Sequence, residues 1–313
     1  MTNQGIDTGD TAWLLTASGL VLLMTPGLAF FYGGMVKKKN LISTMFQSFV
    51  SMGLVSVLWV VVGFSLAFGE SWKGIIGNPF TYIGLRNVTM TPNAAFAATI
   101  PFVLFALFQM KFAIITPALI TGAFAERVRF KAYLLFCVFF SLFIYSPLAH
   151  WAWHPQGFLR QWGVLDFAGG TVVHISAGLA ALVAALFMRG RQDQSHVPGN
   201  IPFVLLGTGM LWFGWFGFNS GSALSANGQA VQAFLTTNTA SATAMLVWML
   251  LDWKIKQKPS SLGACVGAVV GLVTITPAAG YVSLSASVVI GAVGAAVSYF
   301  VVMWRAKVGL DDT

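Results

Sequence analysis

Residues 166–185 read DFAGGTVVHISAGLAALVAA. Apart from the opening aspartate, His174 is the one ionisable side chain in this stretch, and the other residues are small or apolar. A helix needs about 20 predominantly apolar residues to cross a bilayer. We therefore expect a membrane-spanning helix over roughly 165–188, in which Asp166 caps free backbone N–H groups at the start.

His174 follows Asp166 by eight residues, which is a little over two helical turns. The two side chains then lie near the same face, about 12 Å apart along the helix axis. Gly169 and Gly170, between them, leave room for a neighbouring helix. A lone histidine in a membrane either forms a hydrogen bond between helices or lines a pore, and the residues alone leave both interpretations open.

The composition of the whole chain is typical of a membrane protein. Of its 313 residues, 57% are hydrophobic and 8% are charged, whereas soluble domains carry about 25% charged residues. The net charge of +8 does not indicate nucleic-acid binding, because the basic residues separate apolar segments instead of forming one patch. Cys137 and Cys265 lie inside apolar runs, so we expect no disulfide.

Apolar segments of spanning length predict an all-α polytopic membrane protein of about nine transmembrane helices. We expect them to form a single domain over residues 1–313. Pro101 interrupts the third segment and marks the start of its span, since proline is tolerated in a first turn. The expected helices cover roughly 11–34, 41–68, 94–123, 130–150, 165–188, 200–219, 226–251, 262–280 and 284–304.

Basic residues in the loops indicate the orientation, because positive charge concentrates on the cytoplasmic side. One set of alternate loops, with the C-terminal tail, carries thirteen Lys or Arg residues, and the other set carries three. We therefore expect a multi-pass protein of the cell (inner) membrane, with the N-terminus outside and the C-terminus in the cytoplasm. The thirteen are Lys37, Lys38, Lys39, Arg127, Arg129, Lys131, Arg189, Arg191, Lys254, Lys256, Lys258, Arg305 and Lys307, and the three are Lys73, Arg86 and Arg160.

Ionisable side chains inside the expected helices are functional candidates, because such groups are costly in a membrane. They are Lys111, Asp166 and His174. An intramembrane enzyme would need a nucleophile with a base, a metal cluster or a paired set of acids. One histidine and one capping aspartate do not supply these groups, so we expect no enzyme, no cofactor and no metal site.

Several longer segments, in order along the chain, resemble the ammonium transporter (Amt/Mep/Rh) family. The resemblance covers essentially the whole chain, and several long segments in order are far more specific than one short motif. It implies an ammonium-transporter-like helix bundle that moves ammonium or ammonia through a hydrophobic pore. Besides 166–185, the segments are PGLAFFYGGMV (26–36), FQMKFAIITPALITGAFAER (108–127), WFGFNSGSALSAN (215–227) and SLGACVGAVVGLVTITPAAGY (261–281).

The resemblance implies an outer ammonium recruitment site. Phe108 and Trp153 match the aromatic residues of that site, and Ser222 matches its hydroxyl. The residue types suit the substrate, because ammonium is a cation with four N–H donors, which aromatic faces attract and a hydroxyl oxygen can accept.

The resemblance also implies a pore below this site. Phe112 and Phe218 match the pair of rings that closes the pore mouth. Asp166 matches the aspartate beside the vestibule, and His174 matches the first of two pore histidines. Such a histidine can donate and accept hydrogen bonds in a narrow apolar lumen.

Two features depart from the family pattern. Lys111 lies where a neutral residue is expected, and its position between Phe108 and Phe112 on a helix turns it away from the lumen. The family implies eleven helices, made of two five-helix halves in an inverted repeat and one more. The second half is then incomplete here, and the second pore histidine is missing, because no histidine follows His196. We therefore expect a chain that is truncated before its last two helices.

Transport of ammonium or ammonia is the leading interpretation. The alternatives are a membrane protein that senses ammonium and regulates a partner, or an inactive fragment of a transporter. The expected partners are ammonium or ammonia and the lipid bilayer. By the resemblance they also include two further copies in a homotrimer and a possible cytoplasmic nitrogen-signalling regulator, but no nucleic acid.

Overall fold

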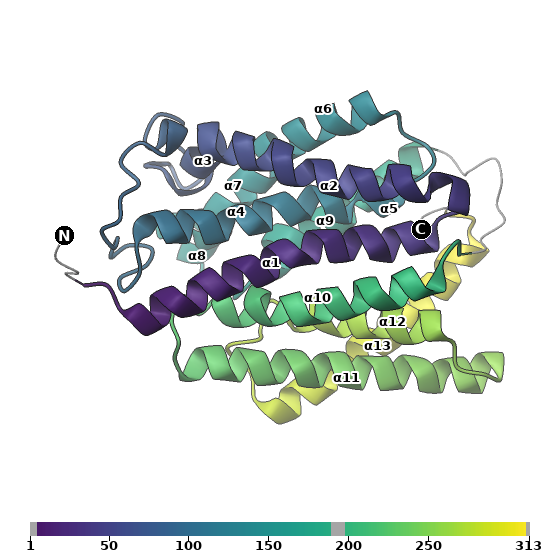
Figure 1. Ribbon diagram of the computed structural model, residues 1–313. Helices are drawn as coiled ribbons and strands as arrows, with labels where there is room; N and C mark the ends of the chain where they lie inside the picture. Colours follow the sequence, from purple (N-terminus) through teal and green to yellow (C-terminus); the bar gives the residue numbers. More distant parts are fainter. Residues whose placement is uncertain (1–4, 189–197, 311–313) are drawn as a thin grey trace.

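The computed structural model describes residues 5–188 and 198–310, and these form a bundle of long helices that run along one common direction (Figure 1). The helices of the first part are α1 (Thr8–Met35), α2 (Leu41–Leu58), α3 (Phe64–Phe68), α4 (Phe102–Leu119), α5 (Thr121–Phe124), α6 (Phe130–Phe140), α7 (Ser146–Trp153), α8 (Phe158–Gln161) and α9 (Ser176–Phe187). Those of the second part are α10 (Ile201–Gly221), α11 (Gly228–Lys256), α12 (Ser261–Ile275) and α13 (Leu284–Lys307).

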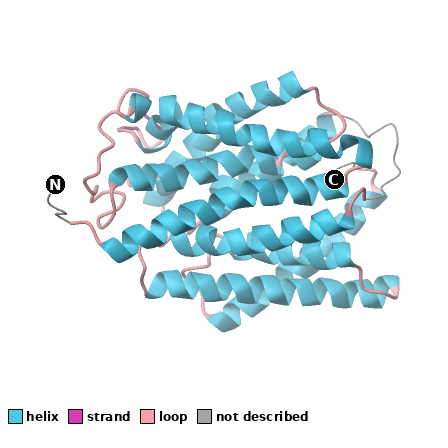
Figure 2. Cartoon of the chain, viewed as in Figure 1, coloured by secondary structure: helices cyan, strands magenta, loops and turns pink. Residues whose placement is uncertain are grey.

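Short irregular elements connect these helices, and Figure 2 shows that helices dominate the described chain. Three π-helical stretches lie within the longer spans: η2 (Trp59–Gly63), η4 (Ser141–Tyr145) and η5 (Gly170–Ile175). Two 3₁₀ turns are η1 (Lys38–Asn40) and η3 (Ile83–Leu85), and one antiparallel hairpin pairs β1 (Ser71–Trp72) with β2 (Ile76–Gly77).

Within the described residues, eight helical spans are long and apolar enough to cross a membrane. They correspond to eight of the nine expected segments. The segment expected at 262–280 is α12, an apolar helix of 15 residues, so the count of nine stays a prediction. The helix expected from residue 165 starts at Gly170, because the preceding Gly169 has a left-handed backbone conformation with φ of 110° that breaks the helical path.

The two parts of the chain join where α1 packs along α10, and Figure 1 shows these helices side by side in the middle of the bundle. Glycines make this close approach possible. A Cβ atom on Gly207 of α10 would lie 2.4 Å from the backbone nitrogen of Phe31, and one on Gly27 of α1 would lie 2.9 Å from Met210. Close backbone contact between small residues is typical of helix packing in membranes.

Two buried aspartates fix the ends of this bundle, and both lie just outside the expected helix ranges. Asp10, at the start of α1, accepts hydrogen bonds from the Ser225 hydroxyl and the Ala226 backbone N–H. Asp252, fully buried near the end of α11, accepts from the Tyr299 hydroxyl at 3.1 Å. Buried carboxylates need such partners, because an unpaired charge is costly away from water.

The start of α1 and the end of α13 lie far apart in the bundle. Figure 1 shows that α1 begins at one end of the bundle and that α13 finishes at the other. Most of the basic residues expected on one side lie at the end where α1 and α13 finish, whereas Arg189 and Arg191 lie outside the described residues. Cys137 and Cys265 are buried free thiols.

Candidate functional site

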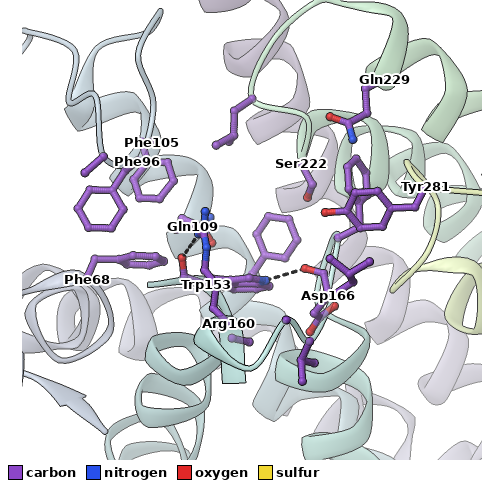
Figure 3. A pocket seen from close by; sticks show the side chains of 18 residues that line it. Phe68, Phe96, Phe105, Gln109, Trp153, Arg160, Asp166, Ser222, Gln229 and Tyr281 are labelled. Carbon is purple, nitrogen blue, oxygen red and sulfur yellow. Dashed lines mark hydrogen bonds between the residues drawn. The ribbon is translucent and has the colours of Figure 1, made fainter. Parts of the chain in front are cut away.

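A cavity of about 460 Å³ lies where α4 and α11 begin and where α7 and α10 finish (Figure 3). We call it the Trp153 cavity. Four of the predicted site residues line it, namely Trp153, Ser222, Phe112 and Asp166. The full lining is Phe68, Ala95, Phe96, Phe105, Gln109, Phe112, Ala152, Trp153, Arg160, Gly163, Val164, Leu165, Asp166, Phe167, Ser222, Leu224, Gln229 and Tyr281.

The polar groups of Trp153 and Ser222 are both directed by backbone carbonyls. The indole Nε1 of Trp153, the last residue of α7, donates to the Asp166 carbonyl at 3.0 Å. The Ser222 hydroxyl, directly after α10, donates to the Phe218 carbonyl at 2.8 Å. Because the serine proton is used in this way, its oxygen lone pairs are available to accept a hydrogen bond from a ligand.

Phe112 lines this cavity, and the Phe218 ring packs against it from outside the lining. We call these two rings the phenylalanine gate. Their centroids are 4.3 Å apart, and both side chains are almost fully buried. Phe112 meets the Trp153 indole edge-on, with centroids 6.0 Å apart. Phe108 packs behind Phe112 at 4.9 Å and is fully buried, so it supports the gate and does not line the Trp153 cavity.

His174 lies on the far side of the gate. Its ring is stacked on Phe218, with centroids 5.8 Å apart, and on Trp215, at 5.3 Å. The Trp215 indole is held by a hydrogen bond from its Nε1 to the Thr276 hydroxyl at 2.9 Å. The buried Nε2 of His174 has no hydrogen-bond partner among the described residues.

A second cavity of about 450 Å³ begins at His174, and we call it the His174 cavity. Trp215, Phe218 and Phe112 are absent from its lining, which is mostly apolar. The phenylalanine gate therefore lies between two cavities, with Trp153 and Ser222 on one side and the predicted pore histidine on the other. The lining of the His174 cavity is Tyr32, Leu119, Ala123, His174, Ala177, Gly178, Ala181, Leu182, Ala185, Val273, Val301, Trp304, Arg305 and Leu310.

Asp166 acts as a cap, as its position at the start of the helix predicted. One carboxylate oxygen accepts from the N–H groups of Gly169 and Gly170, at 2.8 and 2.6 Å. The other accepts from Thr171 and Val172, at 2.8 and 3.1 Å. The four bonds hold the first turn of η5, the π-helical stretch that carries His174. π-Helical turns are frequent at functional sites.

Comparison with known proteins decides the family. A model of the Ammonium Transporter Family matches residues 12–313. An ammonium transporter of Bacillus subtilis is 50% identical over 306 residues, which are 97% of this chain and 75% of that protein. An ammonium transporter of Aquifex aeolicus is 48% identical over 310 residues, 98% of this chain and 72% of that protein. The chain belongs to the ammonium transporter family.

A solved structure agrees with this assignment. The crystal structure of Saccharomyces cerevisiae Mep2 superimposes with a TM-score of 0.93 at 36% identity, over 99% of this chain and 70% of Mep2. The chain thus spans about 70–75% of the length of these relatives, and the expected truncation stays a prediction. Members of the ammonium transporter family are membrane transporters and channels, not enzymes.

In this transporter, Lys111 is half-buried and lines neither the Trp153 cavity nor the His174 cavity. This placement agrees with the expectation that it faces away from the pore. Among the described residues, no group of three or more His, Cys, Asp or Glu side chains is arranged to hold a metal ion.

Sequence reasoning missed three polar residues of the Trp153 cavity, namely Gln109, Gln229 and Tyr281. Gln109 lies on α4 between Phe105 and Phe112, and Tyr281 follows α12. Burial raises the pKa of the Tyr281 phenol, so this side chain is neutral at physiological pH. Gln109 could have been found from its spacing, because residues 105, 109 and 112 share one helix face.

Proposed function

We propose that the Trp153 cavity recruits ammonium as a cation, and that the nitrogen then passes the phenylalanine gate toward His174. The observation that carries this proposal is the pairing of an aromatic face, Trp153, with an acceptor oxygen, Ser222, directly above an apolar gate. Ammonium suits such a site, because aromatic faces attract cations and a hydroxyl oxygen accepts its N–H groups. Phe108 then acts by supporting Phe112.

The gate gives a physical basis for selectivity. Phe112 and Phe218 are buried rings that offer a cation no hydrogen-bond acceptor. Moving a charge through an apolar passage is costly, whereas neutral ammonia loses far less hydration. An ammonium ion that leaves its proton behind can pass as ammonia, and potassium has no proton to lose.

We assign to His174 the role of the first polar contact beyond the gate. Its ring is stacked on Phe218, and it lines the cavity that continues from there. A neutral imidazole carries one donor and one acceptor nitrogen. It can therefore form a hydrogen bond with ammonia, or relay a proton, at the point where the apolar passage widens.

We further propose that the N-terminus lies outside and the C-terminus inside the cell membrane, and that the fold has an inverted repeat in which α1 and α10 are equivalent. The bias of basic residues supports the orientation, and the central pairing of α1 with α10 supports the repeat. A reporter that works only in the cytoplasm, fused to each terminus, tests the orientation. Activity at the N-terminus would contradict it.

The likeness to the ammonium transporter family also leads us to propose a homotrimer and a cytoplasmic nitrogen-signalling regulator as partners. Many apolar side chains are exposed on the described helices, such as Phe139, Phe143 and Val297, and these suit lipid or further copies of the chain. Mass measurement of the protein in native-like lipid discs tests the trimer, and a monomer would contradict it.

Uptake in cells that lack their own ammonium transporters tests the proposed function. The protein should restore growth on low ammonium, and Trp153→Leu should raise the ammonium concentration needed. Cation–π contacts contribute about 0.5–2 kcal/mol, so the shift should be roughly two- to thirtyfold. If cells that carry the wild-type protein fail to take up ammonium, the sensing or inactive alternatives are favoured.

A further inference from the structure

Among the described residues, two side-chain amides line the Trp153 cavity: Gln109 on α4 and the exposed Gln229 on α11. Gln109 is the buried one of the two. It is 9% exposed, and its Oε1 is buried without a hydrogen-bond partner in the described part of the chain. A buried acceptor that has lost water and gained no donor is costly. The amide is therefore incomplete until a molecule with N–H or O–H donors enters the cavity.

The position of Gln109 gives its amide access to the same space as the predicted cation residues. Phe105, Gln109 and Phe112 follow one face of α4 at intervals of four and three residues, and all three line the cavity. In Figure 3, Gln109 lies on the Trp153 side of the cavity and Ser222 lies on the other side. The Trp153 indole N–H already donates to the Asp166 carbonyl and not to this amide oxygen.

We propose that Gln109 is a third ammonium-binding residue, which accepts an N–H of the cation through its amide oxygen beside Trp153 and Ser222. This inference rests on the proposed function of the Trp153 cavity. An amide oxygen has two lone pairs that can accept hydrogen bonds. Rotation of the amide group turns either its oxygen or its NH₂ group toward a ligand, and a cation favours the orientation in which the oxygen faces it. Ammonium can then use two acceptors and one aromatic face at the same time.

A second acceptor also accounts for specificity for ammonium over methylammonium and potassium. Ammonium carries four donors, whereas methylammonium carries three and potassium carries none. A site that satisfies several N–H groups at once rejects analogues that lack them, because its own polar atoms are then left unpaired. Gln109 should therefore increase the preference for ammonium over methylammonium as well as the affinity.

A buried glutamine elsewhere in the bundle provides the matched control. Gln47 on α2 is 7% exposed, and its Oε1 also has no partner among the described residues. It lines neither the Trp153 cavity nor the His174 cavity. If Gln109 acts only through packing, its replacement should affect uptake as the replacement of Gln47 does. If Gln109 binds the substrate, its replacement should have a different effect on uptake from that of Gln47.

The test is the concentration dependence of ammonium and methylammonium uptake by the purified protein in lipid vesicles. Gln109→Leu should raise the KM for ammonium about tenfold, the effect of one charge-assisted hydrogen bond, and narrow the preference for ammonium over methylammonium. Gln109→Glu keeps the acceptor and adds a charge, so it should lower the KM. Gln47→Leu should change neither value.

Failure of the Gln109 inference can be distinguished from failure of the proposed function. If Trp153→Leu raises the KM but Gln109→Leu and Gln109→Glu leave both the KM and the preference unchanged, Gln109 is a packing residue and the inference is wrong. If Gln109→Leu does not fold, Gln109→Glu still decides, because an unchanged KM contradicts the inference. If the wild-type protein itself takes up no ammonium, the proposed function fails first.

Discussion

The indole Nε1 of Trp153 donates a hydrogen bond of 3.0 Å to the backbone carbonyl of Asp166. This bond joins the aromatic wall of the Trp153 cavity to the turn that starts the helix of His174. The Asp166 carboxylate accepts four N–H groups of the same turn. One residue thus uses its backbone to hold the proposed cation site and its side chain to hold the pore helix.

Asp166→Asn should destabilise the protein strongly. Hydrogen bonds to charged groups contribute about 1.5–3 kcal/mol each, and an asparagine amide loses the charge and turns one acceptor into a donor. We expect a clear fall in the thermal unfolding temperature, measured by tryptophan fluorescence in detergent. The control is Asp7→Asn, because Asp7 caps α1 through one bond to the Asp10 N–H and asparagine is as good an N-cap. Equal unfolding temperatures for the two variants would contradict the role of Asp166.

Phe218→Ala should open the phenylalanine gate. The ring fills the space between Phe112 and His174, so its loss should connect the two cavities and let hydrated ions through. Potassium entry into vesicles should rise above the level of the wild-type protein. Truncating a buried phenylalanine also costs about 3–5 kcal/mol of stability, so folding should be checked for each preparation.

A neighbouring phenylalanine controls for this prediction. Phe216 lies on the same helix but stacks on Phe234, with centroids 4.0 Å apart, and it lines neither cavity. Phe216→Ala should leave potassium excluded. If Phe218→Ala also excludes potassium while it remains folded, the gate does not depend on this ring.

Gly207→Ala should weaken the contact between α1 and α10. The added Cβ would lie 2.4 Å from the Phe31 backbone nitrogen and 2.5 Å from the Gly27 carbonyl oxygen, and backbone atoms cannot move aside as a side chain can. Such overpacking typically costs about 1–3 kcal/mol. Gly209→Ala, on the same helix with nothing within 4 Å, should keep the wild-type unfolding temperature. Alanine is a better helix former than glycine, so a drop of the same size in both variants would contradict the assignment of the effect to the contact between α1 and α10.

The sequence predicted the spanning helices well, because apolar length is a strong signal. It could not predict η5, because this π-helical geometry depends on the cap of Asp166 and on the close approach of Gly170 to Pro277. A Cβ atom on Gly170 would lie 2.4 Å from the Pro277 side chain. It also missed Asp10 and Asp252, which lie just beyond the expected helix limits. Their partners come from segments far apart in the chain.

The candidate site was predictable in part. Family resemblance pointed to Trp153, Ser222 and the gate. In the structure Trp153 and Ser222 line one cavity with Phe112, and Phe218 packs against Phe112. Phe108 could not be placed from its spacing, because Gly221 of α10 lies over its ring and buries it behind Phe112. Gln109 carries no ionisable group, so the cost of charge in a membrane does not single it out in the sequence.

The central claim is that the Trp153 cavity selects ammonium before the nitrogen passes the gate. The most direct measurement follows ammonium and potassium entry into the same protein-containing vesicles, for the wild type and for the double variant Trp153→Leu, Ser222→Ala. We predict that the wild type takes up ammonium with potassium present in excess, that potassium enters no faster than in empty vesicles, and that the double variant needs a higher ammonium concentration. Potassium entry as fast as ammonium entry, or an unchanged concentration dependence in the double variant, would contradict the claim.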